Sequence, residues 1–118
     1  MHTIYQFYKL LHNYIKLFPK AEKYSLGQRI ENLTLDTLEL AFRASYASKV
    51  NRSILLEDLD AKVQILKTLI RLAHEIRALD DNKYLALQEN LQEMGKMVGG
   101  WIRSLKTNNT NGTLWGTV

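Results

Sequence analysis

Apolar side chains recur at spacings of three and four residues along most of the chain, which is the period of one face of an α-helix. The clearest stripe runs through three heptads near the C-terminus and consists of Tyr84, Leu87, Leu91, Met94, Val98, Trp101 and Leu105. Earlier stripes consist of Ile4, Tyr8, Leu11, Ile15 and Phe18, and then of Leu26, Ile30, Leu33, Leu40, Ala41 and Ala44. The pattern predicts an all-α protein.

Helix-breaking and helix-capping residues divide this pattern into four helices. Pro19 lacks an N–H group, so the first helix is expected over about residues 3–18 and the second from near Pro19–Ser25 to about Ser48. Asn51 or Ser53 can cap a third helix over about 53–79, and Asp80 or Asp81 a fourth that ends near 106.

Short connections can join only antiparallel neighbours, so four such helices form an up-down-up-down bundle. We expect this bundle to occupy residues 1–106. Residues 107–118 are rich in Thr, Asn and Gly, which bury little apolar surface, and they are expected to form a flexible polar tail.

The third predicted helix carries more apolar surface than one core requires. Its apolar residues spread over about half of the helix circumference, compared with a usual stripe of a little over 100°. They are Leu59, Val63, Ile65, Leu66, Leu69, Ile70, Leu72, Ala73 and Ile76. This excess predicts a homo-oligomer; the alternative is a monomer with a thick core and a few exposed leucines.

Three glycines interrupt the fourth predicted helix, although each costs about 1 kcal/mol relative to alanine. Gly95 and Gly99 are four residues apart and share a face, so they would allow another helix backbone to approach closely, with Gly100 and Trp101 beside them. We therefore expect these residues at a packing or subunit contact. The alternative is that the helix breaks at Gly99 and Gly100.

The composition is that of one globular domain: 118 residues, 46% hydrophobic and 24% charged. The sequence contains no cysteine, and its N-terminal segment lacks the features of a signal peptide. No apolar run approaches the roughly 20 residues that a membrane span needs. We expect a cytoplasmic protein that has no membrane association.

The charge is moderately basic, with 16 Lys and Arg against 12 Asp and Glu and a net charge of +4. In the predicted topology Lys49, Arg52, Arg103 and Lys106 gather at one pole, which favours binding of nucleic acid or another polyanion. The alternative is that these residues serve helix C-termini, where cations offset the dipole. Lys67 and Arg71, which are four residues apart, form a second basic stripe.

Catalytic and metal-binding patterns are weak. His74 and Glu75 begin an HExxH-like string, but its fifth position is Ala78, so no metal site is indicated. Glu57 and Asp58 lie near the start of a helix, where carboxylates stabilise the helix dipole. We expect no catalytic residues, no cofactor and no enzymatic activity.

Four segments carry a family resemblance. They are PheProLys at 18–20, LeuGlyGlnArgIle at 26–30, ArgLeuAla at 71–73 and MetGlyLysMetValGlyGlyTrpIle at 94–102. In order and spacing they resemble the four-helix-bundle family of the accessory variability determinant of diversity-generating retroelements, which includes proteins encoded in ribosomal RNA intervening sequences. The resemblance covers about residues 4–106.

The resemblance implies a homopentameric barrel that binds RNA or DNA without sequence specificity. In the retroelement branch it further implies a reverse transcriptase as partner, during mutagenic copying of a template RNA. The intervening-sequence branch shares the fold and implies only a structural or adaptor protein. The sequence favours the retroelement role and leaves the second branch as the alternative.

Overall fold

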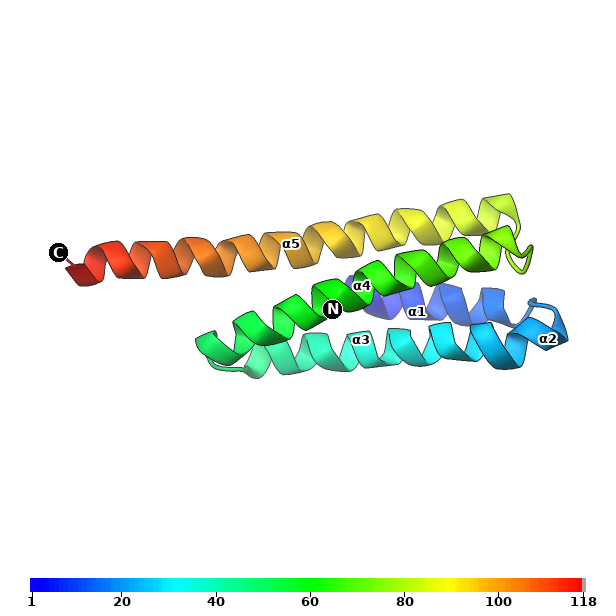
Figure 1. Cartoon of the computed structure of the whole chain (residues 1–118), viewed down its shortest axis with the longest axis horizontal. Helices are drawn as coiled ribbons and strands as arrows, with labels where there is room; N and C mark the ends of the chain where they lie inside the picture. The colour runs from blue at the N-terminus through cyan, green and yellow to red at the C-terminus, as the bar shows by residue number, and fades with distance from the viewer. Residues whose placement is uncertain (118) are drawn as a thin grey trace.

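The computed structural model describes the backbone of residues 1–117 and the side chains of residues 1–106. Its helical segments, in chain order, are α1 (His2–Ile15), α2 (Lys20–Glu22), the π-helix η1 (Lys23–Gly27), α3 (Gln28–Tyr46), α4 (Lys49–Glu75) and α5 (Asp81–Thr117). The segments α2, η1 and α3 follow one another without a gap and together correspond to the second predicted helix. Figure 1 shows that α1, α3, α4 and α5 alternate in direction along the long axis. The all-α, up-down-up-down four-helix bundle is confirmed.

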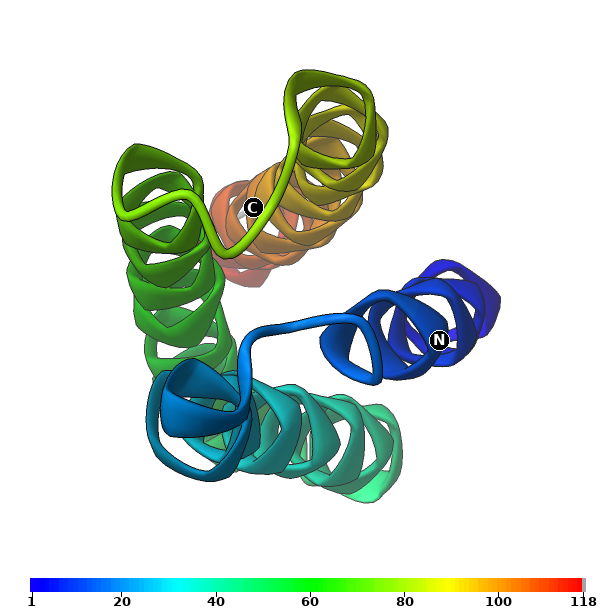
Figure 2. The ribbon, with the colours of Figure 1, turned by 90° about the vertical axis from the view of Figure 1, so that its right-hand side faces the viewer.

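The four long helices lie at the corners of a quadrilateral when the bundle is viewed along its axis (Figure 2). In this arrangement α4 packs against α3 and α5, and α1 closes the bundle by packing against the same two helices. Each helix therefore packs mainly against antiparallel neighbours, as short connections require.

The core contains the apolar stripes that the sequence predicts. Ile4, Leu11, Ile30, Leu66 and Leu91, for example, are fully buried, and so is Phe7, which the predicted stripe omits. Tyr8 and Trp101 are only half-buried. Two threonines of α3 are also buried, and each donates its hydroxyl hydrogen bond to the carbonyl four residues earlier, Thr34 to Ile30 and Thr37 to Leu33. These bonds satisfy the hydroxyl groups that burial removes from water.

The first helix ends three residues earlier than predicted. The N–H groups of Leu17 and Phe18 donate to the carbonyl oxygens of Tyr14 and Ile15, each at 3.0 Å, so the chain tightens into a turn of three-residue bonds before Pro19. Phe18 is nevertheless buried in the core.

Helix α4 begins at Lys49 rather than near Ser53, and neither Asn51 nor Ser53 is its N-cap. The N-cap is Ser48, whose backbone is extended, and the amide of Arg52 bonds to the Ser48 carbonyl at 2.7 Å. The prediction of a later start was wrong because the polar residues of this segment were interpreted as a loop, whereas the helix accommodates them on its exposed surface.

The C-terminal end of α4 is a Schellman turn in which arginine, rather than the usual glycine, takes the left-handed position. Arg77 has a positive φ of 67°, its N–H donates to His74, and the N–H of Ala78 donates to Ala73 at 2.8 Å. The helix therefore ends at Glu75 rather than at 79. Arg77 occupies a left-handed conformation, which is energetically unfavourable for any residue that has a Cβ atom.

Asp80, one of the two residues predicted as the cap, is the N-cap of α5. Its Oδ1 accepts a hydrogen bond from the backbone N–H of Lys83 at 2.9 Å, and its Oδ2 one from the Lys83 ammonium group at 2.8 Å. The hydrogen bond from this ammonium group, followed by that from the N–H, holds the pKa of Asp80 below its ordinary value.

Helix α5 continues through Gly95, Gly99 and Gly100, so the alternative of a helix break there is wrong. The helix also extends beyond Lys106, where the sequence predicts a change to a flexible tail. The side chains of residues 107–118 lie outside the described part of the chain, and the tail remains a prediction.

Candidate nucleic-acid interface

A polar groove runs along the surface between α4 and α5, and we refer to it as the α4–α5 groove. It consists of two adjacent cavities of about 530 and 340 Å³ that share Gln64 and Lys67 in their linings. The groove is lined by Gln64, Lys67, Thr68 and Arg71 of α4 and by Tyr84, Gln88, Gln92, Gly95, Lys96 and Arg103 of α5. Four of these residues are cationic and none carries a carboxylate.

Helical periodicity brings the four cations of the groove together. Lys67 and Arg71 are four residues apart on α4, and Lys96 and Arg103 are seven apart on α5, so each pair lies on one side of its helix. Leu66 and Ile70, which precede these two cations of α4 in sequence, are buried in the core. The bundle thus leaves two cationic stripes facing the same groove.

Gly95 provides space for the Lys67 side chain across the groove. A Cβ atom at position 95 would lie 3.3 Å from the Lys67 Nζ, closer than most carbon contacts. A hydrogen bond from Gln88 Nε2 to the Lys67 carbonyl, at 3.3 Å, also connects the two helices. The glycine therefore lets the half-buried ammonium group lie against the backbone of α5.

One end of the groove carries an aromatic ring. Tyr84 stacks on His74 with a centroid distance of 4.1 Å and an interplanar angle of 11°, and His74 Nε2 lies 2.7 Å from Asp81 Oδ1. Arg71 lies nearby and is 3.9 Å from the exposed Glu75 carboxylate, a surface contact that contributes little. Tyr84 is half-buried and one face of its ring is covered by His74, so the ring forms part of the groove wall.

Three of the six predicted binding residues, Lys67, Arg71 and Arg103, line the groove, whereas Lys49, Arg52 and Lys106 do not. Lys96 belongs with the first three, and the sequence interpretation missed it. The signal was available, because Lys96 lies one heptad before Arg103.

The residues of the predicted basic pole do not line one common cavity. The Arg52 guanidinium donates to three carbonyl oxygens at the end of α3, those of Ala44 at 2.9 Å, Ser45 at 3.3 Å and Ala47 at 3.1 Å. This is the helix-capping role that was the alternative interpretation. Lys106 lines a separate cavity of about 220 Å³.

That separate cavity differs from the α4–α5 groove in its charge. Glu57 and Asp60 are part of its lining, so Lys106 lies in a region with two carboxylates. Lys49 is exposed in the first turn of α4. Asp58, which the sequence places near Glu57, forms an exposed contact of 3.4 Å with Lys62 one turn later.

Among the described side chains, the three glycines of α5 lie next to cationic side chains and not next to the backbone of another helix. Cβ atoms at Gly99 and Gly100 would meet only the Arg103 guanidinium of the same helix, at 3.3 and 3.7 Å, among the described side chains. Trp101 packs against the core while remaining half-exposed. The predicted approach of another helix backbone is thus absent within this part of the chain, and a role in subunit contact remains a prediction.

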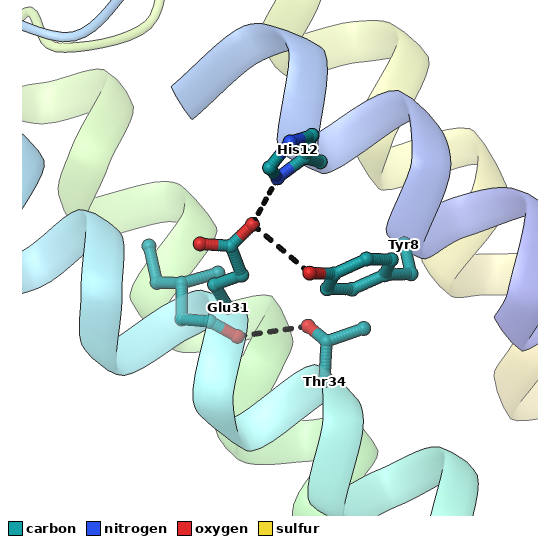
Figure 3. A network of polar contacts seen from close by, with 5 residues as sticks. Tyr8, His12, Glu31 and Thr34 are labelled. Carbon is teal, nitrogen blue, oxygen red and sulfur yellow. Dashed lines mark hydrogen bonds and ion pairs between the residues drawn. The ribbon is translucent and has the colours of Figure 1, made fainter. Parts of the chain in front are cut away.

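A second polar cluster connects α1 to α3 (Figure 3). His12 Nδ1 contacts Glu31 Oε1, and the Tyr8 hydroxyl donates to the same oxygen at 3.2 Å. Burial, followed by the charge of Glu31 and this hydrogen bond, raises the pKa of Tyr8 above its ordinary value. Tyr8 therefore remains a hydrogen-bond donor to the carboxylate.

The described residues lack the side-chain clusters of a metal site and the apolar helices of a membrane protein. Among them, no group of three or more His, Asp or Glu side chains is placed to hold a metal ion. Within the same residues, no helix is long and apolar enough to cross a membrane.

The fold and the groove together define a small helical bundle with one cationic surface between its last two helices. The family model described as bAvd-like matches residues 1–105, and the chain belongs to this bAvd-like family. The match spans the four segments that carry the resemblance in the sequence and confirms it. No protein in the curated collection matches the chain.

Proposed function

We propose that this chain is a non-enzymatic accessory protein of a diversity-generating retroelement that binds nucleic acid through the α4–α5 groove. The observation that carries the proposal is the lining of this groove, in which Lys67, Arg71, Lys96 and Arg103 occur without a carboxylate. Membership in the bAvd-like family supports the accessory role and supports template RNA or its cDNA as the nucleic acid.

The chemistry of the groove favours contacts to the phosphate backbone. At 1.5 Å per residue, Lys67 and Arg71 lie about 6 Å apart along the helix axis, and Lys96 and Arg103 about 10 Å apart. Cations at this spacing can neutralise several consecutive phosphates and release their counterions. Phosphate contacts carry no sequence information, so we expect binding to RNA and DNA without sequence specificity.

We also propose that the chain acts as a homo-oligomer, with a pentamer as the expected form. Large apolar side chains are exposed on α3 and α4: Leu35, Phe42, Tyr46, Val50, Ile54, Ile65, Leu72 and Ile76 are each at least 42% exposed. So many exposed apolar residues on two neighbouring helices favour a subunit contact. Assembly would repeat the groove around the oligomer and multiply its affinity for a long polyanion.

The reverse transcriptase is the second proposed partner, on the basis of the family. A bound nucleic acid in the groove would place the template beside the polymerase, so that one accessory oligomer holds both. Mutagenic copying would then depend on the cations of the groove as well as on the polymerase contact.

The second candidate function is a structural or adaptor bundle of the intervening-sequence type. It is favoured by Arg52, whose guanidinium caps α3, since this shows one basic residue in a purely structural role. In an adaptor, the exposed apolar residues of α3 and α4 would bind protein and the groove would have no nucleic-acid role.

Charge reversal separates these two functions. Fluorescence anisotropy with a labelled RNA or DNA of about 20 nucleotides would be measured for wild type, for Lys67→Glu/Arg71→Glu and for the control Lys49→Glu/Lys106→Glu. Each variant changes the net charge by the same amount. We expect the groove variant to lose at least about 100-fold in affinity and the control less than about 10-fold. Equal losses, or no binding by wild type, would refute the proposal.

The reverse-transcriptase contact has its own readout. Pull-down of the polymerase by the tagged accessory protein would be compared after nuclease treatment. Retention of the polymerase without nucleic acid supports a direct protein contact, whereas its loss would restrict the interaction to a shared nucleic acid.

A further inference from the structure

A cleft of about 280 Å³ lies between the end of α1, the π-helix η1 and the start of α3, and we refer to it as the α1–η1 cleft. His12 and Lys16 line it from the end of α1, Lys23 and Tyr24 from η1, and Gln28, Glu31 and Asn32 from α3. It shares no lining residue with the α4–α5 groove. The α1–η1 cleft is therefore a separate site.

The polar network of Figure 3 fixes the imidazole at the edge of this cleft. Glu31 Oε1 contacts His12 Nδ1 and accepts a hydrogen bond from the Tyr8 hydroxyl at 3.2 Å. A carboxylate only accepts hydrogen bonds, so Nδ1 carries the proton in this contact and Nε2 of a neutral ring is an acceptor. Glu31 contacts two side chains of α1, so it orients His12 and also adds a negative charge to the cleft.

The remaining charged groups of the cleft are the ammonium groups of Lys16 and Lys23. The Lys23 Nζ lies 5.7 Å from the ring centroid of Tyr24, whose side chain is 65% exposed. A cation and an aromatic face thus occur side by side. Gln28 and Asn32 are four residues apart on α3 and add two amide groups on the same side of that helix.

The π-helix gives the cleft its wall. Such single-turn widenings are rare and are often found at functional sites. A Cβ atom at Gly27 would lie 3.1 Å from Ile15 Cγ2 and 3.2 Å from the Glu22 carbonyl oxygen, so η1 packs closely against the end of α1. Ile15 itself is buried and contributes an apolar residue to the cleft lining.

We propose that the α1–η1 cleft binds one nucleotide, with its phosphate between Lys16 and Lys23 and its base on the Tyr24 ring. Lysines act as point charges for phosphate, and aromatic rings and amide groups bind the face and the edges of an unstacked base. The cleft, of about 280 Å³, is smaller than either cavity of the α4–α5 groove, which favours one nucleotide over a strand. The two sources of this chemistry are a free mononucleotide and the 5′-phosphorylated end of a nucleic acid.

The test is a titration of the ¹⁵N-labelled full chain with adenosine monophosphate, followed by two-dimensional NMR. We expect shifts of the amides around residues 12–32 and a dissociation constant at or below about 1 mM. Lys16→Gln/Lys23→Gln should weaken binding by at least about 10-fold, and Tyr24→Leu should abolish the preference for the nucleotide over ribose 5-phosphate. The matched control Lys49→Gln/Lys106→Gln should bind as wild type does, and circular dichroism confirms that each variant is folded.

Absence of shifts at about 5 mM nucleotide, or equal binding by the Lys16→Gln/Lys23→Gln variant, would overturn the proposal. Competition then assigns the source. Displacement by a 5′-phosphorylated oligonucleotide but not by its 5′-hydroxyl form identifies a strand end, and displacement by neither identifies a free nucleotide. Equal displacement by both forms would contradict the role of the phosphate in the cleft. The α1–η1 cleft shares no lining residue with the α4–α5 groove, so failure of this proposal and failure of the proposed function are distinguishable.

Discussion

The Schellman turn at the end of α4 provides a stability test that depends on one backbone angle. Arg77 has a φ of 67°, while the hydrogen bonds of the turn are made by backbone groups that any residue provides. Glycine adopts this conformation without the clash of a Cβ atom, which costs a residue with a side chain about 1 kcal/mol. We expect Arg77→Gly to stabilise the folded chain, although glycine lowers stability in most other positions.

The magnitude follows from two opposing terms. Relief of the left-handed strain gains about 1 kcal/mol, and the greater freedom of glycine in the unfolded chain offsets part of it, so the net gain is about 0.5 kcal/mol and the melting temperature rises by about 2 to 4 °C. Arg77→Ala is the control, because it removes the guanidinium and keeps the Cβ atom. Urea denaturation of the three proteins measures the difference. If glycine and alanine have equal effects, the backbone account of this turn is wrong.

Three other predictions concern stability and assembly. The pKa of Asp80 lies below its ordinary value because the folded chain stabilises the carboxylate. The contribution of this carboxylate and Lys83 to folding stability is therefore complete above the unfolded-state pKa of about 3.9 and is lost as the pH falls through the folded-state pKa. The difference in unfolding free energy between wild type and Asp80→Asn should disappear over that range. A gap that persists at lower pH would exclude the carboxylate as its cause. Leu66→Ala should lower the free energy of unfolding by about 2 to 5 kcal/mol and Leu72→Ala by less than about 0.5 kcal/mol in the monomer, because only Leu66 is fully buried. Urea denaturation measures both values, and similar losses would contradict the assignment of Leu66 to the core. Gly99→Ala should add about 1 kcal/mol of helix stability and shift the mass in light scattering toward the monomer; unchanged mass would remove Gly99 from the subunit contact.

The bundle could be predicted from the sequence because its apolar residues keep one helical period. In the predicted stripe of α5, the buried residues are Leu87, Leu91, Met94, Val98 and Leu105. The ends of helices were harder, since they depend on backbone groups rather than on apolar spacing. Ser48 caps α4 with its backbone, and Arg77 adopts the conformation that glycine usually marks. Neither residue type identifies these ends on its own.

The candidate site could be predicted only in part. Lys67 and Arg71 were grouped by their spacing on one helix, but their alignment with Lys96 and Arg103 depends on how α4 packs against α5. The role of Arg52 in the predicted basic pole could not be predicted for a related reason: a charge count along the chain does not reveal that its guanidinium turns back onto three carbonyl groups. Side-chain direction, rather than position in sequence, decides which cations are available to a ligand.

The central claim is that the four cations of the α4–α5 groove bind phosphate groups, and the salt dependence of DNA binding tests it most directly. If each cation neutralises one phosphate, the logarithm of the binding constant should fall with the logarithm of salt concentration with a slope of about −3.6 for each bound subunit. Lys67→Gln/Arg103→Gln should reduce this slope to about −1.8, while Lys49→Gln/Lys106→Gln, which removes the same charge outside the groove, should leave it unchanged. Equal slopes for the two variants would contradict the claim, because binding would then follow the net charge of the molecule rather than the groove.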